Sequence, residues 1–285
     1  MRMHGEIDAA PAGVRRRTSY ILGVRYDDLD GATALRTVED FVAGRDGERP
    51  RRVVFTNVHT VHLARGNREF LGAVNDADLV LPDGSGLSIA ARVLGGSVTE
   101  NLNGTDFVPR VLERARALGW TVYLLGGRPG VASSARAVLL DRLPGLKIAG
   151  FHSGFFTPRE EGALIREINA ARPDILLVAL GSPVQELWAA RNLHRIDAGV
   201  CFAVGGLFDF LSGAFRRAPA WMRRMGIEWV YRFLGDPLAK WERVFVEMPV
   251  FLTLTVAARI GLILRSLSPR NWSEPPLSLQ EKEPL

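Results

Sequence analysis

The sequence has only one cysteine in 285 residues, Cys201, which lies in the apolar run GVCFAVGG. A single thiol excludes an internal disulfide bond and any metal site built from several cysteines. A lone cysteine among apolar residues is far more often part of the packed core than a reactive group. We therefore expect a protein of a reducing compartment, in which Cys201 is buried and takes no part in chemistry.

Long uncharged apolar runs are also missing. Residues 1–20 carry three consecutive arginines with no apolar core after them, so they do not read as a secretory signal. The apolar segment 248–267 is interrupted by Arg259 and Arg265, and its uncharged part is well short of the about 20 residues that cross a bilayer. We expect a helix lying in the membrane interface, with a helix buried in an oligomer and a poor spanning segment as alternatives.

The full G-x-G-x-x-G spacing of dinucleotide-binding turns is absent as well. Gly126 and Gly127 begin a GGRPG turn between a predicted strand and a predicted helix, where backbone amides could face a phosphate. A plain tight turn explains these glycines equally well. No acidic residue ends the next predicted strand, where a dinucleotide enzyme holds the ribose. An NAD(P)-binding Rossmann oxidoreductase therefore stays only as an alternative.

The sequence offers no complete metal site. His59 and His62 lie three residues apart on a predicted helix, without a nearby acid to complete a ligand set. The acid clusters at residues 27–30 and 76–78 resemble the Asp-x-Asp pairs that hold a divalent cation with a nucleotide diphosphate. The first lacks the later ligands of a calcium loop, and the second precedes a strand. We interpret both clusters as solvated turns and expect neither a metal nor a cofactor.

Short β-branched and apolar runs alternate with helix-length amphipathic segments along most of the chain. Strands are predicted at residues 20–24, 53–56, 79–81, 121–125, 147–151, 175–180 and 200–204. Helices are predicted at residues 32–42, 107–118, 130–143, 158–171 and 184–193. This alternation predicts an α/β fold with a Rossmann-like, mainly parallel sheet covered by helices on both faces.

Polar and glycine residues directly follow four of the predicted strands. These turns are 57–59 (NVH), 82–86 (PDGSG), 126–127 (GG) and 181–183 (GSP). The carboxyl ends of parallel strands meet at one edge of a sheet, and ligands bind there at a topological switch point. We therefore expect the functional site at this edge.

Several side chains in these turns are candidates for chemistry. Asp83 could cap the following helix or act as a general base, and the two roles are compatible. Thr56 and Asn57 could hold a sugar or a carboxylate, or serve as ordinary turn residues. A carboxylate such as Glu186 is stabilising near a helix N-terminus, so its presence there needs no functional explanation. Gln185 has no such explanation.

A basic and aromatic segment extends over residues 204–245. Between residues 216 and 243, seven basic and three acidic side chains contribute most of the chain's formal net charge of +5. Such a patch beside apolar residues fits a diphosphate and anionic lipid better than a nucleic-acid groove. In a helix, Arg224, Glu228 and Arg232 share one face, close to Trp221 and Trp229, and tryptophan is typical of the lipid headgroup zone.

Taken together, these segments resemble the WecG/TagA/CpsF family of bacterial glycosyltransferases, glycosyltransferase family 26. The resemblance covers about residues 20–245, in order through TNVHTVHLA, DADLVLPDGSGL, NGTDFV, VYLLGG, GFF, PDILLVALGSPVQE and the basic aromatic segment. It implies an inverting, metal-independent transfer of a sugar from a UDP-sugar to a polyprenyl-diphosphate-linked saccharide. N-acetylmannosamine, its uronic acid, glucose and similar sugars are all compatible donors.

The resemblance also implies roles for individual residues. Asp83 is expected to be the catalytic base. The residues expected to bind substrate are Thr56, Asn57 and Gln185, with arginines that the C-terminal appendage supplies: Arg217, Arg224 and Arg232. The residues expected near the nucleotide are Asp209, in GGLFDFLSG, together with the candidates Gly126, Gly127, Phe155 and Phe156, although the two phenylalanines could equally form a hydrophobic corner.

Two features depart from the family pattern. The family often has a lysine before the glutamine of GxPxQE, where this chain has Val184, so a cation is missing near that turn. The apolar segment after Phe245 also continues beyond the usual end, which we interpret as a stronger membrane anchor.

The predicted organisation has four parts. They are a disordered arm (1–18), an α/β glycosyltransferase domain (19–215), a basic and apolar helical appendage (216–267) and a disordered tail (268–285). The expected partners are a UDP-sugar donor, a polyprenyl-diphosphate-linked acceptor and the cytoplasmic membrane surface, with no nucleic acid; a homo-oligomer stays open. We expect a cytoplasmic protein, peripheral on the inner leaflet of the cell membrane, in surface polysaccharide synthesis. A non-catalytic membrane-associated assembly protein is the second alternative.

Overall fold

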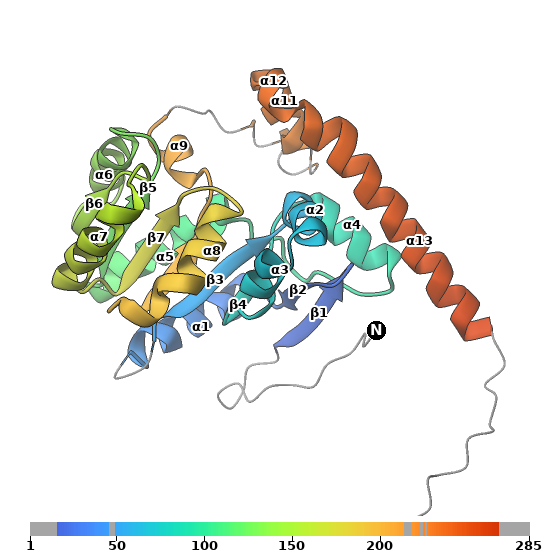
Figure 1. Ribbon diagram of the computed structural model, residues 1–285, viewed down its shortest axis with the longest axis horizontal. Coiled ribbons are helices and arrows are strands. Elements are labelled where there is room, and N and C mark those ends of the chain that lie inside the picture. Colours follow the sequence, from blue (N-terminus) through green and yellow to red (C-terminus); the bar gives the residue numbers. More distant parts are fainter. Residues whose placement is uncertain are drawn as a thin grey trace, which may run out of the picture.

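The centre of the molecule is a six-stranded parallel sheet. The computed structural model describes residues 16–45, 49–213, 218–219, 221–222, 225 and 227–267. The strand order is β4-β3-β8-β7-β5-β6, and every neighbouring pair is parallel (Figure 1). The strands are β3 (Arg51–Thr56), β4 (Leu79–Pro82), β5 (Thr121–Gly126), β6 (Lys147–His152), β7 (Ile175–Ala179) and β8 (Val200–Ala203). The predicted α/β fold with a mainly parallel sheet is confirmed.

Helices cover both faces of the sheet because the inner strands are apolar on both sides. In β3, for example, Val53 and Phe55 pack into one core and Val54 into the other. The first face is covered by α1 (Gly31–Ala43), α5 (Gly104–Leu118), α6 (Val131–Arg142) and α9 (Leu207–Leu211). The second face is covered by α2 (Val58–Gly66), α3 (Arg68–Asn75), α4 (Ser85–Val93), α7 (Pro158–Ala171) and α8 (Val184–Asn192), which runs into η1 (Leu193–Arg195).

Cys201 lies within β8 and is buried, as its apolar neighbours predict. Burial raises the pKa of its thiol to about 12, so the thiolate is not formed near neutral pH. The residue is therefore part of the core.

An antiparallel hairpin precedes the sheet, and here the predicted strand 20–24 is wrong. Its two strands are β1 (Arg17–Ile21) and β2 (Val24–Asp28), joined by Leu22 and Gly23. Both turn residues have positive φ, 51° and 89°, which turns the chain back on itself. The apolar side chains on either side of the turn read as one continuous run. Strand β1 also begins inside the segment predicted as a disordered arm, whereas residues 1–15 lie outside the described residues.

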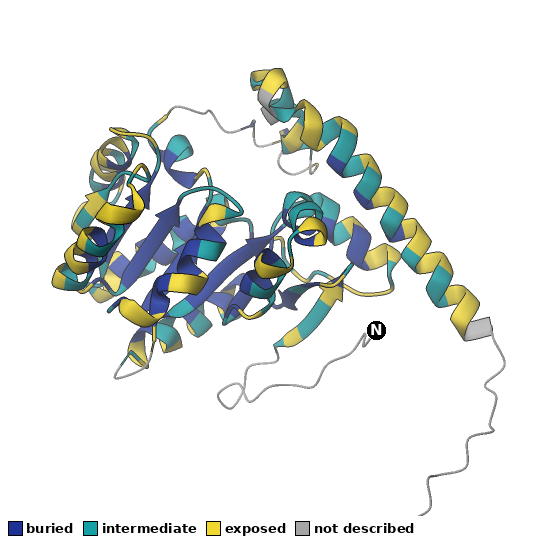
Figure 2. Ribbon diagram, in the orientation of Figure 1, coloured by how far each residue is buried: buried dark blue, intermediate teal, exposed yellow. Residues whose placement is uncertain are grey.

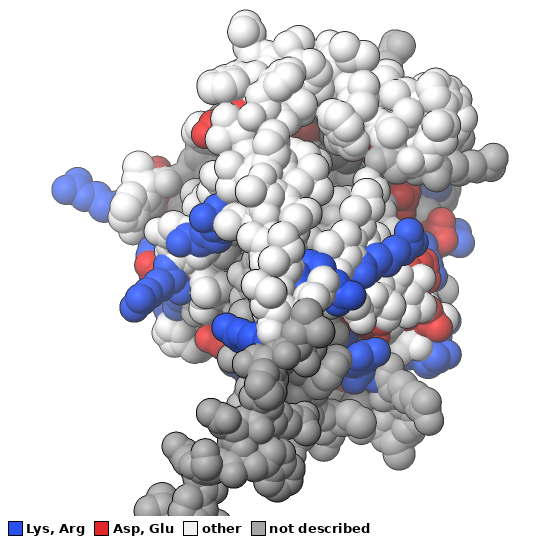
Figure 3. Space-filling model, turned by 90° about the vertical axis from the view of Figure 1, so that its right-hand side faces the viewer, with Lys and Arg blue, Asp and Glu red and all other residues white. Residues whose placement is uncertain are grey.

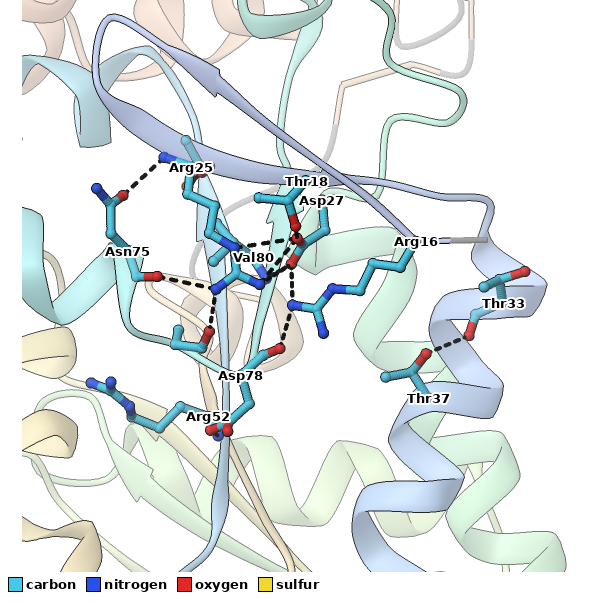
Figure 4. Close-up of polar contacts among 12 residues, drawn as sticks. Arg16, Thr18, Arg25, Asp27, Thr33, Thr37, Arg52, Asn75, Asp78 and Val80 are labelled. Carbon is cyan, nitrogen blue, oxygen red and sulfur yellow. Dashed lines mark hydrogen bonds and ion pairs between the residues drawn. The ribbon is translucent and has the colours of Figure 1, made fainter. Parts of the chain in front are cut away.

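Of the acid cluster 27–30, Asp30 is exposed, but Asp27 and Asp28 are buried in β2, so the interpretation as a solvated turn is wrong for these two. Asp27 is fully buried and pairs with Arg16 at 2.7 Å and with Arg25 at 3.1 Å (Figure 4). It also accepts hydrogen bonds from Thr18 Oγ1 and from the backbone N–H of Val80 in β4. Asp27 therefore fastens the hairpin to the edge of the parallel sheet.

The second acid cluster is likewise only partly solvated. Asp76 is exposed, but Asp78 accepts a 2.7 Å hydrogen bond from the backbone N–H of Arg52 and pairs with Arg49 at 2.8 Å. Burial, the largest single cause, would raise the pKa of Asp78, but these two hydrogen bonds together with the positive charges of Arg49 and Arg51 lower it. The carboxylate ties β4 to the start of β3.

The C-terminal part of the described chain is helical. It consists of α11 (Glu228–Gly235), α12 (Pro237–Glu242), the π-helical turn η2 (Arg243–Glu247) and α13 (Met248–Leu267). One side of η2 and α13 is buried against α2 and α4. The buried residues lie at four-residue spacing: Glu247, Phe251 and Thr255. Residues 1–15 and the predicted tail 268–285 lie outside the described residues.

The opposite side of α13 is apolar and exposed (Figure 2). Its side chains are 43% to 61% exposed: Leu252, Val256, Ile260, Ile263 and Leu264. Figure 3 shows this side of the molecule as an uncharged surface with lysine and arginine side chains on both flanks. Within the described residues, the continuous helix Lys240–Arg265 is long and apolar enough to cross a membrane by length and composition alone.

Candidate active site

A cavity of about 1000 Å³ lies at the carboxyl ends of β3, β4, β7 and β8 and extends to the C-terminal helices. Three of the four predicted polar turns contribute to its lining, through residues 57–59, 83–86 and 181–182. The sheet order explains why they meet, since β4, β3, β8 and β7 are consecutive neighbours. Such a cavity outside the carboxyl ends of parallel strands is where α/β folds bind their ligands.

Asp83 lines the cavity directly after β4. Its backbone N–H donates to the carbonyl of Thr56 at 2.8 Å, which extends the pairing of β3 with β4 by one residue. Its Oδ2 accepts a 3.0 Å hydrogen bond from Asn57 Nδ2. The N-cap residue of helix α4 is Gly84, which directly follows Asp83. Asp83 therefore lies at the cavity, immediately before the start of α4.

Asn57 is held on two sides. It is the N-cap of α2, and its Oδ1 accepts from the backbone N–H of Thr60 at 3.0 Å and from Thr60 Oγ1 at 3.2 Å. Because the amide is planar, committing its oxygen to the cap directs Nδ2 toward Asp83. Thr56, by contrast, is fully buried, donates from Oγ1 to the carbonyl of Arg25, and is not among the residues lining the cavity.

Gln185 lines the cavity but is only 3% exposed. Its Oε1 accepts a 2.9 Å hydrogen bond from the backbone N–H of Gly205, which follows β8. Its Nε2 donates to Glu186 Oε1 at 2.9 Å. The side chain therefore links the start of α8 to the turn after the neighbouring strand, and shapes the floor of the cavity.

Glu186 is a buried carboxyl group beside the cavity. Oε1 accepts from Ser182 Oγ and from Gln185, whereas buried Oε2 has no hydrogen-bond partner among the described residues. Burial raises the pKa of Glu186 above its ordinary value, against the two hydrogen bonds, which lower it. In the sequence, the position of Glu186 near a helix N-terminus was reason enough for an acidic residue. That position does not explain why the carboxyl group is buried.

Replacing Glu186 by Gln is expected to stabilise the protein in a pH-dependent way. A carboxyl group with a raised pKa in the folded state stabilises it at low pH, and this contribution is lost as pH rises above the unfolded pKa. Glu186→Gln should therefore melt a few degrees above the parent protein at pH 8, since a stabilisation of 1 kcal/mol raises the melting temperature of a chain of this size by about 2–4 °C. The difference in melting temperature between the two proteins should be smaller at pH 5. Differential scanning calorimetry at both pH values measures this.

The exposed Glu113 on α5 provides the matched control, because Glu113→Gln should show no pH-dependent gap. A Glu186→Gln variant that melts below the parent at pH 8 would contradict the assignment of a buried carboxyl group with a raised pKa.

The glycine turn after β5 lies away from the cavity, since neither Gly126 nor Gly127 is among its lining residues. A Cβ at Gly126 would collide with the backbone of Ala179 in β7, so close strand packing explains this glycine. Phe155 and Phe156 do not line the cavity either. Phe155 is 69% exposed, while Phe156 packs edge-on against Trp188 with ring centroids 6.4 Å apart.

Asp209 on α9 lines the cavity, near the Gly205–Gly206 turn. Of the three arginines predicted from the appendage, Arg217 and Arg224 lie outside the described residues. Arg232 belongs to α11, but its side chain lies outside the described part of the chain. The basic residues that the structure does place at the cavity are Lys240 and Arg243.

Several cavity residues were not predicted from the sequence. Asn101 lies just before α5, and Asn103 and Asp106 lie at its start, in the NGTDFV segment that entered only through the family resemblance. Asn101 Oδ1 accepts from the backbone N–H of Gly84 at 2.7 Å and so holds the turn that carries Asp83. The C-terminal helices add a largely apolar wall: Trp229, Tyr231, Phe233, Leu234, Val244 and Met248.

The cavity thus has a polar side from the sheet and an apolar side from the appendage. The polar side offers carboxylates and amides that can accept protons and hydrogen bonds from a hydroxylated ligand. Lys240 and Arg243 add positive charge on the other side. Over the described residues, no group of three or more His, Cys, Asp and Glu side chains is arranged to hold a metal ion.

Comparison with known proteins defines the class of this protein. The model of the WecG/TagA/CpsF family of glycosyl transferases matches residues 19–263. The chain therefore belongs to this family, and it is a glycosyltransferase.

Similar curated proteins come from Staphylococcus aureus, strains MW2 and NCTC 8325. Each is 27% identical to this chain over 234 residues, which cover 81% of this chain and 89% of theirs. Both are named N-acetylglucosaminyldiphosphoundecaprenol N-acetyl-beta-D-mannosaminyltransferase.

Proposed function

We propose that the protein transfers a sugar from a UDP-sugar to a polyprenyl-diphosphate-linked saccharide, with inversion and without a metal, in the synthesis of a bacterial surface polysaccharide. The observation that carries this proposal is the Asp83 carboxylate, hydrogen-bonded by Asn57 at a cavity that the C-terminal helices complete. A carboxylate so placed can serve as general base for a sugar hydroxyl.

The identity of the substrates rests on the relatives. Their name specifies an N-acetylglucosaminyl diphosphoundecaprenol acceptor and an N-acetylmannosaminyl group. For this chain we propose the same class of acceptor, a saccharide on a polyprenyl diphosphate. N-acetylmannosamine is the first candidate for the donor sugar, and its uronic acid and glucose are the next.

The proposed reaction is a single displacement. Asp83 takes the proton of the acceptor hydroxyl while the hydroxyl oxygen attacks the anomeric carbon on the face opposite UDP. The bond from the anomeric carbon to the UDP oxygen breaks, UDP leaves with the electron pair, and the configuration inverts. Positive charge near the departing diphosphate would come from Lys240, Arg243 and the predicted arginines 217, 224 and 232.

We further propose that the protein is peripheral on the cytoplasmic face of the membrane. The exposed apolar side of α13 and the basic side chains on its flanks suit the boundary between acyl chains and anionic headgroups. Glu247, Phe251 and Thr255 pack on the catalytic domain, so a helix that spans the bilayer would have to leave this contact. Lying on the surface keeps the cavity next to a lipid-linked acceptor.

The decisive experiment incubates the purified protein with a panel of UDP-sugars and short-chain lipid-diphosphate saccharides. One pair should yield a product heavier by one sugar residue by mass spectrometry, with the anomeric configuration inverted by NMR. Addition of EDTA should leave the rate unchanged. Binding of NAD(P) with no transfer from any UDP-sugar would instead support the oxidoreductase alternative.

A further inference from the structure

A partly buried polar contact joins the C-terminal helices to the catalytic domain beside the cavity. His59 Nδ1 lies 2.9 Å from both Oε1 and Oε2 of Glu247. Glu247 is only 4% exposed and ends the π-helical turn η2, directly before α13. Both residues line the cavity. The contact spans 188 residues of sequence and connects η2, directly before α13, to the first turn of α2.

The same turn of α2 holds the orientation of Asp83. Asn57 caps this turn through Thr60 and donates from Nδ2 to Asp83. A displacement of the first turn of α2 therefore moves the amide that fixes one oxygen of the carboxylate. Continuous contacts run from Glu247 through His59 and the helix cap to Asp83.

Docking of the C-terminal helix does not by itself require this polar pair. Phe251 joins the core packed around α2 and α4, and Met248 lies against the start of α4 near Gly86. Replacing a buried polar pair by apolar side chains is often neutral or stabilising, because polar groups lose their hydration on burial. A hydrogen-bonded pair at this place instead fixes the orientation of η2 relative to the first turn of α2. π-helical turns such as η2 are also frequent at functional sites.

The surroundings of His59 favour its neutral form. Burial, the largest cause, and Arg243 on η2 lower its pKa below the ordinary 6.5, as does His62 on α2, while Glu247 opposes this shift. A neutral imidazole beside both carboxylate oxygens carries its hydrogen on Nδ1 and donates it to Glu247. The contact is therefore a directional hydrogen bond at neutral pH.

We propose that His59 and Glu247 are positioning residues, which hold the first turn of α2 against the C-terminal helices and thereby keep Asp83 in its productive orientation. This inference rests on the proposed function of Asp83. It ties the helix that meets the lipid surface to the catalytic carboxylate, so that full turnover requires α13 to be seated on the domain.

The test compares three variants of the pair: His59→Asn keeps both partners polar, His59→Leu leaves only Glu247 polar, and His59→Leu/Glu247→Leu makes both apolar. His59→Leu should lower kcat by about 10- to 100-fold, with KM for the donor nearly unchanged, because small misplacements of a catalytic group have effects of this size. His59→Asn, whose amide N–H can replace Nδ1–H, should retain most of kcat. These rates are measured on the short-chain acceptor without vesicles.

The double variant His59→Leu/Glu247→Leu separates positioning from docking. It should melt at or above the temperature of the parent and bind vesicles as well, yet keep the low kcat of the single variant. His194→Leu and Glu242→Leu, at exposed positions that do not line the cavity, are the matched controls and should leave kcat unchanged.

Parental kcat in the double variant would overturn the inference, since the pair would then only fasten the helix. So would a kcat of His59→Asn as low as that of His59→Leu. Absence of turnover in the parent protein itself would instead contradict the proposed function, so the two failures are distinguishable.

Discussion

Replacing Asp83 by Asn is expected to lower kcat by about 10²–10⁴-fold while UDP-sugar binding stays close to that of the parent protein. The carboxamide has the same shape as the carboxylate, and its oxygen can still accept the hydrogen bond from Asn57 Nδ2. What it loses is the ability to take the proton of the acceptor hydroxyl. Steady-state kinetics on the short-chain acceptor and calorimetric titration of the UDP-sugar measure the two quantities.

The matched control is Asp141→Asn, which makes the same change on the exposed surface of α6. It should leave both kcat and binding unchanged. Near-normal turnover of Asp83→Asn would remove Asp83 as the base. If surface polysaccharide is lost on deletion of the protein but not in the Asp83→Asn variant, the non-catalytic assembly alternative gains support.

Truncation after residue 227 is expected to abolish transfer to a lipid-linked acceptor and to release the protein from vesicles. The cavity would lose its apolar wall together with Lys240 and Arg243, and α2 would lose its contact with Glu247. Each apolar side chain removed from the lipid costs about 1.5–3 kcal/mol of binding free energy, so the loss of vesicle affinity should exceed about 10³-fold. Co-sedimentation with anionic vesicles and the mass-based transfer assay measure the two losses.

Residual UDP-sugar binding should survive this truncation, because the polar turns at the strand ends remain. A chain ending at residue 267 is the control and should keep both activities. Retained transfer to the lipid-linked acceptor by the shorter chain would show that the appendage does not complete the site.

A double variant separates membrane binding from completion of the active site, the two proposed roles of the appendage, without removing a cavity wall. Val256→Glu/Ile260→Glu places two charges on the exposed apolar side of α13 and should lower vesicle binding at least about 10-fold. Its kcat on the short-chain acceptor should match the parent protein. Leu118→Glu, at an exposed apolar position at the end of α5, should alter neither.

The sequence predicted the parallel sheet and most of its helices because their signals are local. The inner strands are continuous apolar runs, and helices such as α7 have capping residues and periodic apolar positions that can be read without knowing their neighbours. The hairpin β1–β2 was missed because its two-residue turn lies within an apolar run. Asp27 was misread because its partners Arg16, just before β1, and Val80, in β4, are distant from it in the sequence.

The site was predicted in part for the same reason. The turns after β3, β4 and β7 were recognised from their polar residues, but which turns meet depends on strand order. The order places β8 between β3 and β7 and leaves β5 farther away, so the Gly126–Gly127 turn does not reach the cavity. The roles of Asn57 and Gln185 as orienting residues follow from hydrogen bonds that no sequence spacing reveals.

The sequence by itself determined the fold class, the polar turns at the strand ends, the Asp83 turn and the membership of a glycosyltransferase family, because these depend on periodicity and short motifs. Only the tertiary structure decided that Asn57 orients Asp83, that Glu186 is a buried carboxyl group, and that His59 meets Glu247 across 188 residues. The physical reason is that such contacts depend on strand order and helix docking, which bring together side chains whose local sequences carry no record of each other.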